Sequence, residues 1–146
     1  MPDIDQEKPL HVMAFDFGLK RTGVAMGQSL IQTSQGLETL AMKNEQPHWD
    51  VVVSLIEKWC PDLLLVGLPL AIDGAETVMS TKARQFARRL HGRMGIKTIV
   101  WDERFSSYQA KHEQPASNYR QHSIDSLAAQ YVLASWFNND MPMQLP

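Results

Sequence analysis

The chain has 146 residues, of which 44% are hydrophobic, and a formal net charge of -2 at pH 7. This length fits a single domain, and this hydrophobic content is enough for one core, which argues against a disordered chain. No apolar run approaches the ~20 residues that a helix needs to cross a bilayer, so we expect no membrane partner. The small net charge gives no overall attraction to nucleic acid, so any such contact depends on local clusters.

The N-terminus and the single cysteine bear on the location of the protein. Residues 1–8 are polar and acidic, without the basic start and apolar stretch of an export signal. Cys60 has no second cysteine with which to form an intrachain disulfide, and we interpret it as a small side chain packed beside an apolar stripe. We therefore expect a cytoplasmic protein, with flexible tails at residues 1–9 and 138–146.

The first half of the chain predicts three strands and a helix. Apolar residues 11–17 and 22–28 predict two strands, joined by a hairpin turn at residues 18–21. Residues 30–40 predict a third strand, polar and near an edge, and residues 44–47 predict a connection. The helix that follows has an apolar stripe of Trp49, Val52, Val53, Ile56 and Trp59.

The second half alternates strands with helices. Residues 63–66 are continuously apolar, which is typical of a strand covered on both faces, and residues 97–101 predict the last strand. The final helix, residues 124–137, is apolar on nearly every side and should be buried. Between the two strands, another helix has an apolar stripe of Met79, Ala83, Phe86, Ala87 and Leu90.

This order of elements defines the expected fold. Three opening strands followed by helices that alternate with strands imply a mixed sheet, because parallel strands are connected through helices. We therefore predict a single α/β domain over residues 1–146, with a five-stranded mixed sheet and helices on both of its faces.

Three acidic residues are candidates for a functional role because of their positions in the predicted elements. Asp16 is the lone acid of the first strand, where a carboxylate is costly unless it is paired, metal-bound or functional. Glu103 follows the last strand, and because side chains alternate along a strand, Asp102 and Glu103 should face opposite sides. Asp125 lies at the start of the otherwise apolar last helix. Each acid also has an ordinary interpretation, namely turn hydrogen bonds, surface ion pairs and a favourable helix dipole, respectively.

The expected topology would bring these acids together. Strand ends of alternating strands and helices meet at one edge of a sheet, where binding sites collect. Because Mg²⁺ is bound by carboxylates together with phosphate and water, we hypothesise a shared metal site of Asp16, Glu103 and Asp125. Other chemistries lack signals: the five histidines show no paired metal-ligand spacing, and neither a Gly-x-Ser-x-Gly elbow nor a Walker A loop is present.

Four sequence blocks resemble, in order, the motifs of the YqgF (RuvX) family. They are DFGLKRTGVA at 16–25, VGLPL at 66–70 followed by DG at 73–74, DERFSS at 102–107, and IDSLAA at 124–129. Together they extend over most of the chain, from about residue 11 to residue 137. No block is specific by itself, but the four in this order are.

The resemblance implies a ribonuclease H-like fold, as in Holliday-junction resolvases. It also implies a nuclease site of Asp16, Glu103 and Asp125 that uses Mg²⁺ or Mn²⁺. The family is described both as Holliday-junction resolvases and as nucleases that mature the precursor of small-subunit ribosomal RNA. We favour precursor rRNA as the partner, with branched DNA as the alternative, and a homodimer is a further expectation.

Basic residues near the acids are predicted to bind the substrate. Lys20, Arg21 and Arg104 lie within the motif blocks, and we predict that they contact substrate phosphates. A second basic run, residues 82–97, contains no acid. It is either a solvated helix face or an outer surface that faces phosphates.

Two functions of other classes are also compatible with parts of the sequence. A binding module of the same fold would act in ribosome assembly or transcription without cleavage, and metal titration followed by a nuclease assay would separate it from an enzyme. A relative of the actin-like sugar kinases would open with a similar Asp-x-Gly motif. Such kinases need two domains to enclose ATP, however, and this chain has the length of one.

Overall fold

The computed structural model describes residues 8–104 and 121–146, except for the side chains of residues 121–123. Its strands are β1 His11–Asp16, β2 Arg21–Gln28, β3 Thr33–Gly36, β4 Leu40–Lys43, β5 Gln46–Pro47, β6 Leu63–Leu68 and β7 Thr98–Asp102. Its helices are α2 Trp49–Trp59, α3 Val78–Met94 and α5 Gln121–Asn138. None of these helices has the length and apolar character that a membrane crossing needs.

The strands form one mixed sheet with the order β5-β4-β2-β1-β6-β7, and β3 pairs with β2 beside this path. β1 is antiparallel to β2 but parallel to β6, which in turn is parallel to β7. The predicted mixed sheet is therefore confirmed. Because β1, β6 and β7 run in the same direction, their carboxyl ends lie side by side at one edge.

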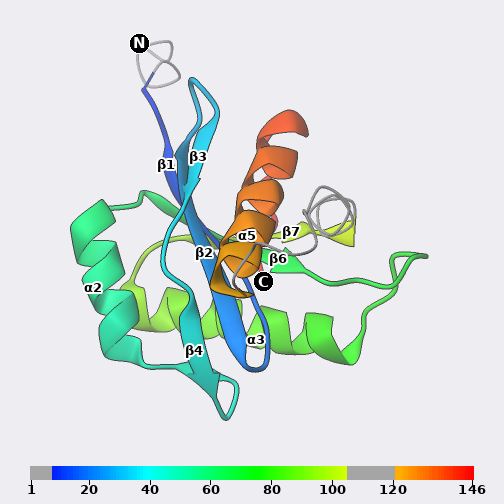
Figure 1. The fold of residues 1–146 in the computed structure, drawn as a ribbon. Coiled ribbons are helices and arrows are strands. Elements are labelled where there is room, and N and C mark those ends of the chain that lie inside the picture. The colour runs from blue at the N-terminus through cyan, green and yellow to red at the C-terminus, as the bar shows by residue number, and fades with distance from the viewer. Residues whose placement is uncertain (1–7, 105–120) are drawn as a thin grey trace.

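Helices cover both faces of the sheet, as predicted (Figure 1). On one face, α2 and α3 pack over a core that includes Met13 and Phe15 of β1. On the other face, α5 packs over a core that includes Val12 and Ala14. Since side chains alternate along a strand, Asp16 at the end of β1 belongs to the face that α5 covers.

The prediction of a single strand at residues 30–40 is wrong. Two strands lie here, and they pair with different stretches of β2: β3 with Ala25–Gln28 and β4 with Arg21–Thr22. The predicted connection contains a further short strand, β5, because Asn44 and Glu45 form a two-residue hairpin turn with φ angles of 53° and 65°. Five predicted strands thus become seven in the described residues.

The predicted helices α2 and α3 are confirmed, with small differences in the residues that each of them buries. In α3 the stripe is buried as predicted from Ala83 to Leu90, and the side chain of Thr77 caps the helix by accepting a hydrogen bond from the backbone of Ser80. In α2 the buried residues are Val52 and Leu55. The apolar spacing of α2 had pointed to Val53, which is 40% exposed.

Cys60 is exposed, so its prediction as a packed side chain is wrong. The residue follows α2 as its C-cap, with a left-handed φ of 48°, and its N–H donates to the carbonyl of Ile56. Its position outside the helix removes it from the apolar stripe. The apolar stripe predicted from the sequence contained no information on the direction of the capping residue.

α5 lies very close to β2 because glycines face it. A Cβ atom at Gly23 would lie 1.9 Å from the carbonyl oxygen of Asp125, and a Cβ at Gly27 would lie 2.6 Å from a methyl carbon of Leu133. The absence of a side chain therefore lets the helix backbone rest on the strand. Since α5 begins at Gln121, earlier than predicted, Asp125 lies in its second turn.

The residues after α5 return along the outer edge of β7. Val100 N donates to Gln144 O at 2.8 Å. The Trp136 indole donates to Pro142 O, and Arg88 donates to Pro146 O, both at 2.9 Å. These contacts cover an edge strand that would otherwise be open to other chains. They argue against a freely moving segment, although the flexibility of residues 138–146 stays a prediction.

Replacement of Gly23 by Ala should lower the free energy of unfolding by about 1–3 kcal/mol, because the new methyl group would overlap the backbone of Asp125. Gly92→Ala is the matched control, since nothing lies within 4 Å of a Cβ at this position of α3. Alanine is preferred over glycine in a helix, so the control should gain about 0.5–1 kcal/mol. Urea unfolding measures both changes. A Gly23→Ala variant as stable as the wild type would show that α5 does not rest on β2.

Candidate active site

Asp16 and Glu103, two of the predicted site residues, meet at the carboxyl ends of β1 and β7. Glu103 directly follows β7, and its N–H donates to Leu68 O of β6 at 3.0 Å. Its side chain lies close enough to that of Asp16 for the two acids to interact electrostatically, and Glu103 is only 5% exposed, whereas Asp16 is partly exposed. The site therefore contains two neighbouring acids, of which Glu103 is buried, and we call them the Asp16–Glu103 pair.

The pair is unfavourable when both members are charged. Burial raises the pKa of Glu103 well above its ordinary value, and the charge of Asp16 raises this pKa further, as does the charge of Asp102. The charge of a proton or of a cation can compensate the two neighbouring carboxylates. A donor set of carboxylate oxygens fits a hard divalent cation, so the pair is suited to bind one.

Gly67 provides the space for the Glu103 carboxylate. A Cβ atom at Gly67 of β6 would lie 2.4 Å from Glu103 Oε2. A larger residue would push the carboxylate out of its place beside Asp16. The sequence patterns carried no signal for this role, because it depends on which side chain from another strand lies opposite the glycine.

Asp125 lies near the pair, but its carboxylate has another partner. Its backbone rests on Gly23, which is paired with Asp16 across β1 and β2, where facing residues are about 5 Å apart. Its Oδ2 atom accepts a hydrogen bond from Arg21 Nε at 3.1 Å. Among the described residues, no three His, Cys, Asp or Glu side chains form a cluster that could hold a metal ion. The structure thus unites two of the predicted acids and turns the third towards Arg21.

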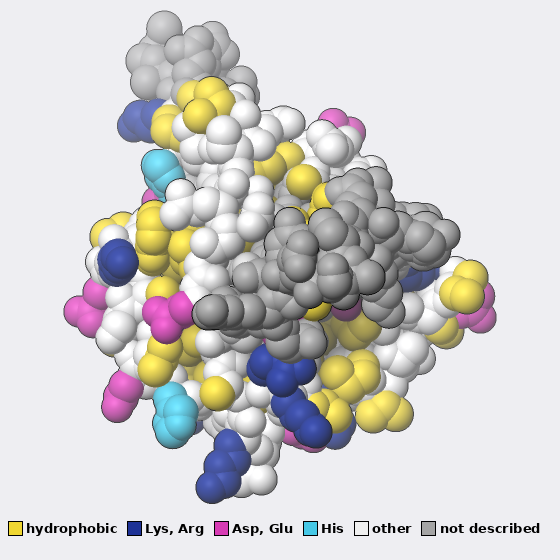
Figure 2. Space-filling model, viewed as in Figure 1, with side chains coloured by type: hydrophobic (Ala, Val, Ile, Leu, Met, Phe, Trp, Pro, Cys, Tyr) yellow, Lys and Arg dark blue, Asp and Glu magenta, His cyan; other side chains and the backbone are white. Residues whose placement is uncertain are grey.

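The three predicted phosphate-binding residues have different surroundings. Lys20 is exposed in the turn between β1 and β2, and the adjacent Arg21 side chain is 45% exposed. Figure 2 shows Lys and Arg side chains gathered over this turn. In contrast, Arg104 Nε pairs with Asp102 Oδ2 at 2.6 Å, and its Nη1 donates to Ile72 O at 2.8 Å. Arg104 therefore connects the loop after β6 to the end of β7. The Asp102 carboxylate pairs with Arg104 and not with Asp16.

The basic run at residues 82–97 makes ion pairs within the protein. Lys82 pairs with Glu45. Arg84 donates from Nε and Nη2 to the two carboxylate oxygens of Glu76, at 2.8 Å each. These contacts favour the interpretation of this run as a solvated helix face over that of a surface that faces phosphates.

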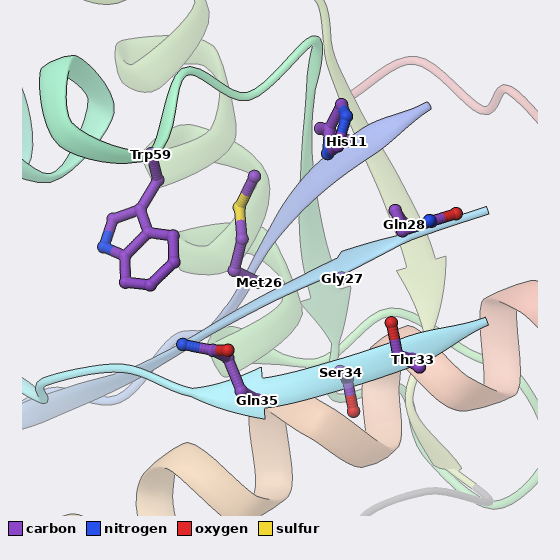
Figure 3. Close-up of a pocket in the computed structure, with 8 residues that line it drawn as sticks. All are labelled: His11, Met26, Gly27, Gln28, Thr33, Ser34, Gln35 and Trp59. Atoms are coloured by element: carbon purple, nitrogen blue, oxygen red, sulfur yellow. The ribbon is translucent and has the colours of Figure 1, made fainter. Parts of the chain in front are cut away.

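A hollow of about 360 Å³ lies at the other end of the sheet (Figure 3). Its lining includes His11, Met26, Gln35 and Trp59 and contains no acidic residue. His11 and Asp16 are the first and last residues of β1, so about 17 Å of extended strand separates them. The hollow is therefore distinct from the Asp16–Glu103 pair.

The mixed sheet and the helices on both of its faces define a ribonuclease H-like domain, and the acidic pair lies at the carboxyl ends of its strands. Solved structures share this fold, and two of them illustrate the likeness. RuvC from T. thermophilus, in complex with a Holliday junction substrate, aligns over 90% of this chain and 96% of its own with a TM-score of 0.54 and 15% identity. The fowlpox virus resolvase, in complex with substrate Holliday junction DNA, aligns over 91% and 100% with a TM-score of 0.56 and 11% identity. At these identities the likeness shows the fold alone.

Sequence comparison goes further than the fold. Residues 10–139 match the family described as "RuvX: Holliday junction resolvase". A curated relative from Chromohalobacter salexigens, named "Putative pre-16S rRNA nuclease", is 44% identical over 137 residues, which are 91% of this chain and 93% of the relative. The chain therefore belongs to the RuvX family, as its motif blocks predicted. Nuclease chemistry on this fold depends in general on a divalent metal ion, and the carboxylates of the Asp16–Glu103 pair are suited to bind one.

Replacement of Glu103 by Gln should stabilise the metal-free protein at alkaline pH. Because the pKa of Glu103 is raised on folding, the folded state holds a proton that the unfolded chain has released, and stability falls as the pH rises from the ordinary Glu range through the folded pKa. The Gln variant has no such proton to lose. At pH 8 in EDTA its gain should be about 1–3 kcal/mol, and near pH 4 the gain should shrink towards zero.

Urea unfolding at several pH values measures this difference. Glu57→Gln, on the exposed side of α2, is the control and should leave the pH dependence unchanged. A Glu103→Gln variant that is less stable than the wild type at pH 8 would contradict the description of a strained acidic pair.

Proposed function

We propose that the chain is a metal-dependent endonuclease that hydrolyses phosphodiester bonds in structured nucleic acid, with the precursor of small-subunit rRNA as its substrate. The observation that carries the proposal is the Asp16–Glu103 pair, with Glu103 buried, at the carboxyl edge of a ribonuclease H-like sheet. The choice of RNA is supported by relatives that are 39–44% identical over most of the chain and are named for pre-16S rRNA. The matching family is described by a DNA junction, so branched DNA is the alternative substrate.

Asp16, Glu103 and Asp125 would hold the cation, which we propose to be Mg²⁺ or Mn²⁺ because both prefer carboxylate oxygens. Two such ions can activate a water and stabilise the leaving oxygen in phosphodiester cleavage. Glu103 would release its proton when the cation binds, so that metal affinity should rise with pH. Asp125 would contribute after its carboxylate leaves Arg21.

Other residues of this edge would bind and orient the substrate. Lys20 and Arg21 are exposed beside the acids, where they would neutralise backbone phosphates and make binding salt-dependent. Arg104 already connects Asp102 with the carbonyl of Ile72, so it would keep the loop after β6 in place and could meet a phosphate at its exposed side. A substrate of this kind is found in the cytoplasm, which we propose as the location. A homodimer stays a prediction for analytical ultracentrifugation.

The purified protein should cleave precursor small-subunit rRNA in Mn²⁺ or Mg²⁺ and not in EDTA. Asp16→Asn should lower the rate at least about 100-fold, because loss of residues that only orient metal ligands already costs 10- to 100-fold. Asp50→Asn, the same change at an exposed position of α2, should have no effect. Asp102→Asn should retain more activity than Glu103→Gln, since Asp102 pairs with Arg104 and not with Asp16.

A four-way DNA junction, assayed in parallel, decides between the two substrates. Cleavage of the junction but not of the precursor rRNA would transfer the assignment to branched DNA. Binding of nucleic acid without cleavage of either substrate, with both metals present, would contradict a nuclease and favour a binding module.

A further inference from the structure

The ion pair between Arg21 and Asp125 joins two groups to which the proposed function assigns different ligands, namely a substrate phosphate for Arg21 and a metal ion for Asp125. Arg21 Nε and Asp125 Oδ2 are 3.1 Å apart, although the residues are separated by 104 positions in the sequence. Arg21 is the first residue of β2, and Asp125 lies in α5, so the contact links the sheet to the helix that covers it. In the nuclease proposed above, a cation would need Asp125 and a substrate phosphate would need Arg21.

The backbone on both sides of this ion pair is held in place. The carbonyl of Asp125 rests on Gly23, only two residues after Arg21, so the helix cannot approach the strand further. The Arg21 side chain is 45% exposed, whereas that of Asp125 is 18% exposed. Arg21 is thus the partner that a ligand from solvent reaches first, and release of Asp125 requires only side-chain movement.

The metal ion and the substrate phosphate both compete with the Arg21–Asp125 ion pair. A cation bound by Asp125 would stand next to the guanidinium, where like charges repel. A phosphate bound by Arg21 would withdraw the guanidinium from the Asp125 carboxylate. Whichever ligand binds first must break the ion pair, and the second then binds to a group that is already released.

We propose that Arg21 is a positioning residue that holds Asp125 away from the Asp16–Glu103 pair until a substrate phosphate engages Arg21. This inference rests on the proposed function and deepens it, because it makes the third metal ligand available only with nucleic acid present. Metal and nucleic acid therefore bind cooperatively, and the enhancement is the same for either order of binding. Ion pairs with this degree of exposure limit the enhancement to about two- to fivefold.

The test is the affinity of the full chain for Mn²⁺, measured by calorimetry with and without saturating precursor rRNA whose integrity is checked on a gel. In the wild type, RNA should tighten Mn²⁺ binding about two- to fivefold. In Arg21→Ala, Mn²⁺ alone should bind about two- to fivefold more tightly than in the wild type, and RNA should add little. Thermal unfolding confirms that each variant is folded.

Lys20→Ala is the matched control, because it removes the same charge from the adjacent exposed position without touching the ion pair. It should keep the enhancement by RNA and change the affinity for Mn²⁺ alone less than Arg21→Ala does. Arg21→Lys, which keeps the charge, should restore part of the wild-type behaviour. Equal Mn²⁺ affinities and equal enhancements in Arg21→Ala and Lys20→Ala would overturn the role of Arg21 and leave the nuclease intact. Absence of any Mn²⁺ binding in the wild type would instead refute the metal site of the proposed function and this inference with it.

Discussion

The position of one buried carboxyl group, that of Glu103, beside a second, that of Asp16, is the constraint on which the rest of the site depends. Glu103 is nearly inaccessible and lies beside the charge of Asp16, so the state in which both groups are charged is costly without a compensating cation or proton. A protein tolerates such a pair only where the surrounding structure holds it. Here Gly67 leaves room for the Glu103 carboxylate, and a backbone hydrogen bond to Leu68 fixes the residue to the neighbouring strand.

The arrangement of the sheet explains why the pair lies where it does. β1, β6 and β7 are parallel, so residues far apart in the sequence reach the same edge. α5 packs on one face of the sheet close to this edge, which is possible because Gly23 has no side chain. Arg104 ties the loop after β6 to the end of β7. The edge is thus largely preformed, and the orientation of the Asp125 side chain is the part that a ligand must still change.

The fold and the sequence support different parts of the functional conclusion. Resolvases with 11% and 15% identity share the architecture, which many activities can use. Membership of the RuvX family rests on the match over residues 10–139 and on relatives of about 40% identity. The chemistry rests on the acids themselves. The fold, the family membership and the acidic residues agree on a nuclease. The choice between RNA and DNA depends on the surfaces that bind the substrate rather than on the acidic pair.

The sequence by itself determined what is encoded locally. The apolar run of β6 and the helical stripe of α3 were predicted because burial on two faces and a period of 3.6 residues leave their mark within a short segment. The polar stretch at residues 30–47 has no such pattern, so it was predicted as one strand and a connection, whereas it forms three short strands. The motif blocks also singled out Asp16, Glu103 and Asp125. Only the tertiary structure decided that Glu103 meets Asp16 above Gly67, and that Asp125 faces Arg21, because these contacts depend on which residues of distant segments lie opposite one another.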